Sequence, residues 1–358
     1  MTDVVARTLT RHRAFWERAP ADRPVRGTTR WSQISSRHFD WGIPAGDGTV
    51  EPEMLRVDHF LPQYEALYVE RGPLDDDFVW PAMPPTAIPW LEGILGCPIR
   101  YSVPSGSFHA EPIAGEGAAA GGDLLVVDPG PLDANPWFRK LLEFVEGLTR
   151  LSRGRFAVGL PLTRGPWDIA FAACGATDLY VGLYERPADL RRLAATCAEL
   201  WVDVTRRLAS AIPRWHGGYV SFLGVWGPTF DPMPQDDASV AVSAGLYRRV
   251  MAPADRRVAT AWKRPIFHLH SAGLQVVDVV LDNVLARRGS ALNVDVDLSG
   301  PPVEALLPIL RRVQARRIPL HLLAFDAGQA RALAAELSPV GLAITYQPDD
   351  PAHERVEW

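Results

Sequence analysis

Strand-like and helix-like segments alternate along residues 77–346, and this alternation constrains the fold more than any other feature of the sequence. Short apolar runs predict strands at residues 77–80, 99–103, 156–160, 218–224, 265–270, 291–298, 319–324 and 342–346. Apolar residues at helical spacing predict helices at residues 136–151, 169–173, 187–211, 246–261, 274–285, 302–316 and 327–337. Repeated alternation of this kind indicates the α/β class with parallel strands. About eight such units close into a single (β/α)₈ barrel of the TIM type, which is the fold we expect.

Residues 1–75 are expected to form an N-terminal extension, helical at first and then irregular, that packs on a barrel of residues 76–358. Residues 1–20 have the apolar spacing of an amphipathic helix. The stretch that follows is interrupted by proline and glycine, yet aromatic residues such as Phe39 and Trp41 make it too apolar for a linker. A doubly wound open sheet is the alternative fold. It is disfavoured because no glycine-rich phosphate-binding motif follows a predicted strand.

Composition excludes several classes of protein. The net charge of −5 gives no basic surface of the kind that binds nucleic acid. No apolar run is long enough for a transmembrane helix, and residues 1–18 are too charged for a secretory signal. Three cysteines in 358 residues provide no disulfide framework and indicate a reducing compartment. We therefore expect a cytoplasmic protein that acts on a small molecule.

The segment 265–270 contains the best candidate for a functional site. Alternate side chains of a strand point to the same face, so His268 and His270 lie together, with Leu269 opposite. The active site of a barrel lies at the C-terminal ends of its strands, where this pair falls. Two neighbouring imidazoles bind a metal ion, or act as acid and base near neutral pH. Buried histidines with purely structural hydrogen bonds are the alternative.

The segment 291–298 reverses the usual pattern of a buried strand. Asn293, Asp295 and Asp297 share one face, and valines occupy the other. Carboxylates are rarely buried unless they are paired or bind a metal. Asp295 and Asp297 are therefore candidates for substrate binding in a polar cavity, with a structural network of arginines and aspartates as the alternative.

Further candidates lie in predicted loops and turns. Asp237 follows the loop 225–235 and is a candidate catalytic residue and metal ligand, although an aspartate there also suits a helix cap. Arg164, in the turn 161–166, is a candidate for holding a substrate carboxylate or lies in an ordinary surface turn. His109 is a weaker candidate for substrate binding. Trp90 and Trp226 either fill a large core or line a pocket for a flat apolar ligand.

Several of these segments resemble the uroporphyrinogen decarboxylase superfamily, which also contains the corrinoid-dependent methyltransferases. The order and spacing of the motifs along most of the chain carry the resemblance. They are Phe15-Trp16 before Asp22-Arg23-Pro24, residues 89–92 with 95–98, residues 161–168 with 184–187, Asp237-Ala238-Ser239 before Ser243, and residues 268–273, where members carry H-x-C-G or H-x-D-G.

The resemblance implies a (β/α)₈ barrel, often monomeric or dimeric, with its pocket at the C-terminal ends of the strands. The decarboxylase branch holds propionates with an arginine-rich segment, but residues 58–67 match only its second half and lack both arginines, so porphyrin decarboxylation is not expected. The methyltransferase branch binds zinc through H-x-C and a later cysteine. Here His268 matches, His270 replaces the cysteine, and no cysteine follows Cys197. A harder site formed by His268, His270 and Asp237 suits Zn²⁺ or another divalent ion.

Three functions follow as hypotheses. The leading one is methyl transfer, with a corrinoid, free or on a partner protein, as co-substrate. The second is metal-free decarboxylation of a tetrapyrrole or small carboxylic acid, in which Arg164 holds a carboxylate and Asp237 stabilises developing charge. The third is non-catalytic binding of a corrinoid or tetrapyrrole that stacks on Trp90 and Trp226.

Overall fold

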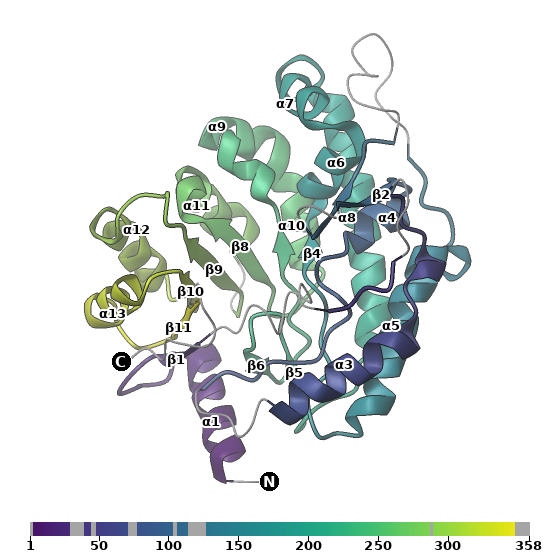
Figure 1. Ribbon diagram of the computed structural model, residues 1–358. Coiled ribbons are helices and arrows are strands. Elements are labelled where there is room, and N and C mark those ends of the chain that lie inside the picture. Colours follow the sequence, from purple (N-terminus) through teal and green to yellow (C-terminus); the bar gives the residue numbers. More distant parts are fainter. Residues whose placement is uncertain are drawn as a thin grey trace.

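The fold is an α/β arrangement in which helices surround a parallel sheet (Figure 1). It is seen in a computed structural model that describes residues 3–28, 39–43, 48–70, 77–102, 106–113, 127–286 and 289–347. The α/β class predicted from the alternating pattern is thereby confirmed.

Five parallel strands form the main sheet. They are β1 (Val25–Thr28), β8 (Ile266–His270), β9 (Ala291–Val296), β10 (Leu320–Ala324) and β11 (Leu342–Tyr346), and they lie in the order β1-β11-β10-β9-β8. All neighbouring pairs are parallel. Every residue of β10 and β11 is buried, as expected of parallel strands covered on both faces. The four strands β8 to β11 were predicted from the sequence, whereas β1 was not.

Helical segments connect consecutive strands, as parallel pairing requires. β9 and β10 are joined by α12 (Val303–Ala315), and β10 and β11 by α13 (Ala327–Glu336). β8 and β9 are joined by a 3-10 turn (Ser271–Val276), α11 (Val277–Val279) and a π-helical segment (Val280–Val284). In α12 the buried residues Leu306, Leu310 and Val313 recur at the spacing of one helix face, which explains why this segment is helical and packs on the sheet.

The other helices form most of the remaining structure. They are α1 (Asp3–Glu17), α3 (Val57–Glu70), α4 (Trp90–Leu95), α5 (Pro136–Ser152), α6 (Pro166–Cys174), α7 (Ala176–Glu185), α8 (Pro187–Ala211), α9 (Ala244–Leu246) and α10 (Ala252–Thr260), with short 3-10 turns at Pro52–Met54, Leu132–Ala134 and Asp237–Ala241 and a π-helical segment at Tyr247–Met251. The long helix α8 packs against α5, α6, α7 and α10. None of the described helices has both the length and the hydropathy that a membrane crossing requires.

Two predicted parallel strands are instead parts of small antiparallel hairpins, so the predictions for these segments were wrong. β2 (Ile99–Ser102) pairs with β3 (Ser107–Ala110), and β5 (Tyr219–Val220) pairs with β6 (Trp226–Gly227). In the second hairpin, Gly224 adopts a left-handed backbone conformation, with φ of 73°. Glycine adopts that conformation without a steric cost, so the chain turns back at this point instead of continuing as a strand.

Short extended segments lie between the two edge strands of the main sheet. Beside β1, the Asp77 amide donates to the Arg26 carbonyl, and further along the same segment Ala82 pairs in parallel with Val158. The strands β4 (Thr163–Arg164) and β7 (Pro234–Gln235) pair in parallel, and the amide of Ile266, the first residue of β8, donates to the Pro232 carbonyl.

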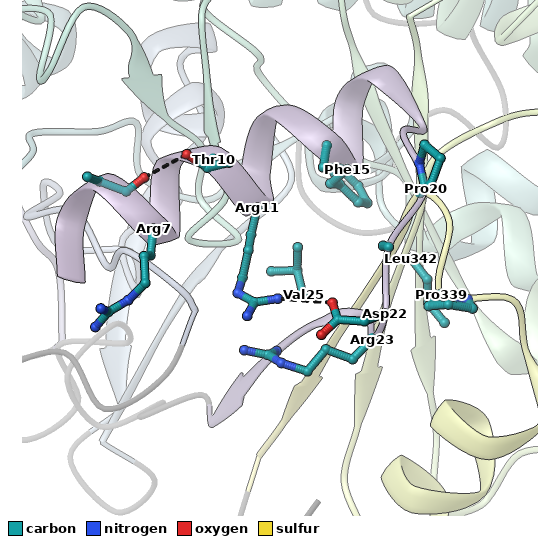
Figure 2. Close-up of a pocket in the computed structure, with 14 residues that line it drawn as sticks. Arg7, Thr10, Arg11, Phe15, Pro20, Asp22, Arg23, Val25, Pro339 and Leu342 are labelled. Carbon is teal, nitrogen blue, oxygen red and sulfur yellow. Dashed lines mark hydrogen bonds and ion pairs between the residues drawn. The ribbon is translucent and has the colours of Figure 1, made fainter. Parts of the chain in front are cut away.

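The N-terminal segment belongs partly to the main sheet. β1 pairs along its whole length with β11, so part of the expected extension is a strand of the sheet. The helix α1 precedes β1, and a hollow of about 410 Å³ lies between α1 and the first residues of β1 and β11 (Figure 2). Arg11 and Asp22 face each other across this hollow, with 3.6 Å between the Nη1 and Oδ1 atoms.

Candidate metal centre

The two histidines of β8 lie side by side, as the strand periodicity predicted. His268 is 3% exposed, whereas His270, the last residue of the strand, is half-buried. The ring centroids are 4.9 Å apart, and the ring planes are nearly perpendicular, at 89°. The pair therefore presents two separate ring edges at the C-terminal end of the strand.

Asp237 faces both rings. It begins the 3-10 turn directly after β7, and β7 lies beside β8. Its Oδ1 atom is 3.7 Å from His268 Nε2 and 3.3 Å from His270 Nε2. Its other oxygen accepts a 2.8 Å hydrogen bond from Gln235 Nε2. The structure thus brings together the three residues that the sequence suggested as metal ligands.

The facing atoms of this group lack hydrogen-bond partners. Among the described residues, neither His268 Nε2 nor Asp237 Oδ1 has one, although both are buried. Buried polar atoms without partners are rare, because each costs free energy. A tetrahedral zinc ion that is 2.0–2.2 Å from each ligand separates its ligand atoms by about 3.4 Å. The observed separations of 3.3 and 3.7 Å from Asp237 Oδ1 fit such an ion.

His270 is held from behind by a second carboxylate. Its Nδ1 atom is 2.7 Å from Asp297 Oδ1, and Asp297 Oδ2 accepts a hydrogen bond from the Ser271 hydroxyl. Contact with Asp237 and the bond to Asp297 raise the pKa of His270 to about 10. Although burial acts in the opposite direction, the bonds from His270 and Ser271 hold the pKa of Asp297 below its usual range. A carboxylate behind a histidine is the usual outer support of a metal-binding imidazole.

His268 is held from behind by a buried hydrogen-bonded chain that crosses three further strands. His268 Nδ1 is 2.5 Å from Asn293 Oδ1, Asn293 Nδ2 is 2.8 Å from His321 Nδ1, and His321 Nε2 is 3.1 Å from the Thr345 hydroxyl. Burial lowers the pKa of His321 to about 3, so that ring is neutral at physiological pH.

The hydrogen positions along this series of hydrogen bonds follow from the bond that Thr345 makes at its end. The Thr345 hydroxyl donates to the Leu322 carbonyl, so it accepts from His321 Nε2. His321 Nδ1 then accepts from the Asn293 amide, and Asn293 Oδ1 accepts from His268 Nδ1–H. Neutral His268 is therefore left with a lone pair on Nε2, the atom that faces Asp237. This is the tautomer that a metal ligand needs.

Replacing Asn293 with leucine is expected to lower the affinity for a divalent ion about 10- to 100-fold, because His268 loses the group that fixes its tautomer and orientation. Titration of the metal-free protein with Zn²⁺ measures the effect. Asn283→Leu is the matched control, since Asn283 bonds only to the Val279 carbonyl within the described residues, on the π-helical segment. Equal affinities for the Asn293 and Asn283 variants would contradict the proposed support of His268 by the hydrogen-bonded side chains behind it.

A group of acidic residues lies behind Asp237, and Arg164 lies beside it. Burial, and then the charges of Asp237 and Asp236, raise the pKa of Asp168 well above its usual range. Arg164 Nη1 is 3.3 Å from the buried carboxylate of Glu92. The charges of Glu92, Asp168 and Asp237 together raise the pKa of Arg164. The arginine suggested by the sequence thus lies on the acidic side of the site.

Of the remaining candidates, Asp295 lies near the histidines, and His109, Trp90 and Trp226 lie elsewhere. Asp295 Oδ1 is 3.9 Å from His268 Nδ1, and burial raises the pKa of Asp295. His109 is exposed on the hairpin β2–β3, opposite Arg100. The Trp90 and Trp226 rings are each 2% exposed, and their N–H groups bond to the carbonyls of Pro85 and Trp215. Both tryptophans therefore pack in the interior, as the core-filling interpretation predicted.

Several residues of the site were not identified from the sequence, among them His321, Thr345 and Tyr180. His321 and Thr345 belong to the chain behind His268, and Tyr180 donates a 3.4 Å hydrogen bond to the carbonyl of Ala238, next to Asp237. His321 occupies the same level of the sheet as His268 and Asn293, which only the strand register reveals. No local pattern marks Tyr180, which lies on an ordinary helix, α7.

Comparison with known proteins gives a match at the level of the fold. Neither family models nor curated proteins match the sequence. Among solved structures, the chain is similar to a methyltransferase from Methanosarcina mazei, with a TM-score of 0.56 over 95% of this chain and 92% of that chain. The two sequences are 15% identical. The chain therefore has a methyltransferase-like fold, with a candidate site of two histidines and an aspartate at the C-terminal end of its parallel strands.

Proposed function

We propose that this protein is a divalent-metal enzyme that transfers a methyl group, with His268, His270 and Asp237 as the metal ligands. One observation carries the metal centre: the buried His268 Nε2 and Asp237 Oδ1 atoms face each other without partners, and His270 Nε2 faces the same oxygen. The fold similarity to a methyltransferase supports the reaction class. The order of motifs that resemble the uroporphyrinogen decarboxylase superfamily supports it separately.

We also propose that the main sheet is part of a closed (β/α)₈ barrel. The hydrogen bonds that run from β1 through Asp77, Ala82 and Val158 support closure on one side. The pairing of β4 with β7 and the bond from Ile266 to Pro232 support it on the other. The extended segments at residues 77–82, 158–164 and 232–235 would add three strands to the five of the main sheet. The total of eight is the number of strands in the predicted barrel.

The donor atoms favour particular ions and substrates. Two imidazole nitrogens and one carboxylate oxygen suit Zn²⁺ or another divalent ion of similar hardness. A bound ion would serve as a Lewis acid for the atom that gains or loses the methyl group. Three protein ligands would leave one position on the ion for the substrate. Because Asp237 is the single anionic ligand, the ion would keep more positive charge than in a site with several thiolates. We therefore propose an oxygen or nitrogen atom of the substrate, rather than a thiol, as the methyl-bearing atom, with a corrinoid as the other methyl carrier.

Residues around the ligands would hold the substrate. The Arg164 guanidinium is available for a carboxylate, since its side chain is 43% exposed although one nitrogen contacts Glu92. Burial and the charges of Asp237 and Asp236 raise the pKa of Asp168, which favours the neutral form of this carboxyl group behind Asp237. Asp297 and Asn293 would keep the two imidazole rings in place.

Metal analysis tests the centre directly. Protein purified without chelators is expected to contain about one divalent ion per chain, and His268→Ala is expected to lose most of it. His59→Ala is the control, because His59 is a more exposed histidine that also faces a carboxylate, with 3.4 Å between its Nε2 and Asp40 Oδ2. An unchanged metal content in His268→Ala, or no metal uptake by the wild-type protein, would exclude the proposed ligands.

Methyl transfer is tested separately with methylcobalamin as the corrinoid. The metal-loaded protein is expected to demethylate it in the presence of an alcohol, phenol or amine acceptor, which changes the visible spectrum, and His268→Ala is expected to be inactive. If metal-loaded protein demethylates nothing with any acceptor class, thiols included, methyl transfer is rejected and the metal centre stands.

Metal-free decarboxylation is the second candidate, and one observation favours it. Without an ion, His270 is a cation at neutral pH, because contact with Asp237 and the bond to Asp297 raise its pKa to about 10. Together with Arg164 it could bind a carboxylated substrate and stabilise the charge that develops when CO₂ leaves. Release of CO₂ from a small carboxylic acid at a rate that chelators do not change would favour this function over the first.

A further inference from the structure

A second hollow, of about 930 Å³, lies at the other end of the main sheet. Its walls come from the end of α1, from the segment after Val280–Val284, and from the residues that lead into β9 and β10. Ser290, which lines it, precedes the first residue of β9, whereas Asp297 of the metal centre follows the last. A strand rises about 3.3 Å per residue, so roughly 20 Å separate the two places.

Positive charge dominates this hollow. Arg18, directly after α1, and Arg317, which follows the C-cap residue of α12, both line it. Burial, and then the charge of Arg317, lower the pKa of Arg18, so the two guanidinium groups repel each other. Of the two carboxylates in the lining, Asp282 is already paired with Arg316, and Glu17 is exposed.

Within the described part of the chain, residues that line the hollow contain several buried donors without an acceptor. The Nε and Nη1 atoms of Arg18 are inaccessible to solvent, and within the described part of the chain no acceptor contacts them. The hydroxyl of Ser290, which is 2% exposed, also lacks a partner there. Buried donors of this kind cost free energy unless an acceptor binds them.

The hollow beside α1 and β1 offers a contrast (Figure 2). Its lining includes Arg7, Arg11 and Arg23, and the last two are paired with the carboxylate of Asp77. Arg11 Nε is 3.4 Å from Asp77 Oδ1, and Arg23 forms a two-pronged bond with the same carboxylate. Among the described residues, a carboxylate thus pairs with Arg11 and Arg23 at one hollow, whereas none pairs with Arg18 and Arg317 at the other.

We propose that the hollow between Arg18 and Arg317 binds a phosphate-type oxyanion, carried by a small organic molecule. A guanidinium group offers parallel N–H donors that match two oxygens of a phosphate. The Ser290 hydroxyl supplies a further donor. Trp16, Leu285 and Ile318 provide an apolar wall for the organic part. This site is independent of the metal centre and of the reaction proposed there.

Isothermal titration with inorganic phosphate tests the site. The titration is done on the full-length wild-type protein and on His268→Ala, in which phosphate on a metal ion cannot contribute. Both are expected to bind phosphate equally, and Arg317→Gln is expected to weaken binding about 10- to 100-fold, as the loss of charge-assisted hydrogen bonds predicts. Arg153→Gln is the matched control, since Arg153 is an exposed arginine with the same left-handed conformation after a helix, α5.

Thermal unfolding distinguishes a binding site from a structural role. In chloride buffer, Arg317→Gln is expected to unfold at the same temperature as the wild-type protein or higher, because the repulsion from Arg18 is removed. At equal ionic strength, phosphate is expected to stabilise the wild-type protein and Arg153→Gln but not Arg317→Gln, and Ser290→Ala is expected to show a reduced effect. Equal stabilisation of all variants by phosphate, or no heat of binding to the wild-type protein, would overturn the proposal.

Discussion

Asp237→Asn is expected to lower the affinity for Zn²⁺ on the order of 100-fold, the share of one ligand in a typical zinc site. Asparagine keeps the shape of the side chain and can still accept the hydrogen bond from Gln235. It removes the negative charge from the oxygen that lies 3.3 Å from His270 Nε2 and 3.7 Å from His268 Nε2. Competition with a chromophoric chelator measures the affinity.

Asp295→Asn is the control for that experiment. Asp295 is also acidic and close to His268, but its Oδ1 atom lies 3.9 Å from Nδ1, the nitrogen already bonded to Asn293. Its replacement should change the affinity far less than that of Asp237. An equal loss in the two variants would mean that general negative charge, rather than a ligand at Asp237, attracts the ion.

Asp236→Ala is expected to lower the free energy of unfolding by about 2–4 kcal/mol. Asp236 Oδ1 accepts hydrogen bonds of 2.7 and 3.1 Å from the Trp167 and Asp168 amides, and so caps α6 from a distant part of the chain. Gly165 is required beside it, because a Cβ atom there would lie 2.3 Å from Asp236 Oδ2. Without the carboxyl group, two buried amides lose their acceptor. Denaturant unfolding measures the change.

Asp236→Asn separates the cap from the charge. Burial, and then Asp255, raise the pKa of Asp236 well above its usual range, and burial raises the pKa of Asp255 to about 7. A carboxyl group whose pKa is higher in the folded state contributes stability that is complete below its unfolded pKa, near 3.8, and is lost as the pH rises through the folded value. We therefore expect the Asp236→Asn substitution to preserve the cap and to make stability less sensitive to pH above about 4, where the carboxyl group of the unfolded chain ionises. A variant as unstable as Asp236→Ala would show that asparagine cannot replace the carboxyl group at this cap.

The correctly predicted strands have residue patterns that identify them without knowledge of their neighbours. β10 and β11 are continuous apolar runs, and β8 and β9 have two-residue periodicity at the site itself. β1 has only four residues, with an arginine and a glycine at its centre, and it is a strand because β11 pairs with it. The segment 218–224 has strand composition, but Gly224 turns the chain back. Local composition does not determine pairing partners, and these two errors follow from that.

The candidate site was likewise predictable only where it depends on the pattern within a single strand. The periodicity of one strand was enough to bring His268 and His270 together, because both belong to the same element. Asp237 reaches them through the packing of β7 beside β8, which depends on long-range contacts. His321 and Thr345 support His268 across three strand pairs, so their role is visible only when the register is known.

The pairing of β1 with β11 sets the order in which the chain completes its sheet during synthesis. Val25 is synthesised long before Ala343, the residue that pairs with it in β11. At 5–20 residues per second, a ribosome needs roughly 15–60 s to make the intervening 300 or so residues. During that time one edge of β1 has no neighbouring strand, and the final closure has a high contact order, which slows folding. The nascent protein is therefore expected to depend on protection of its N-terminal region until the last strand leaves the ribosome.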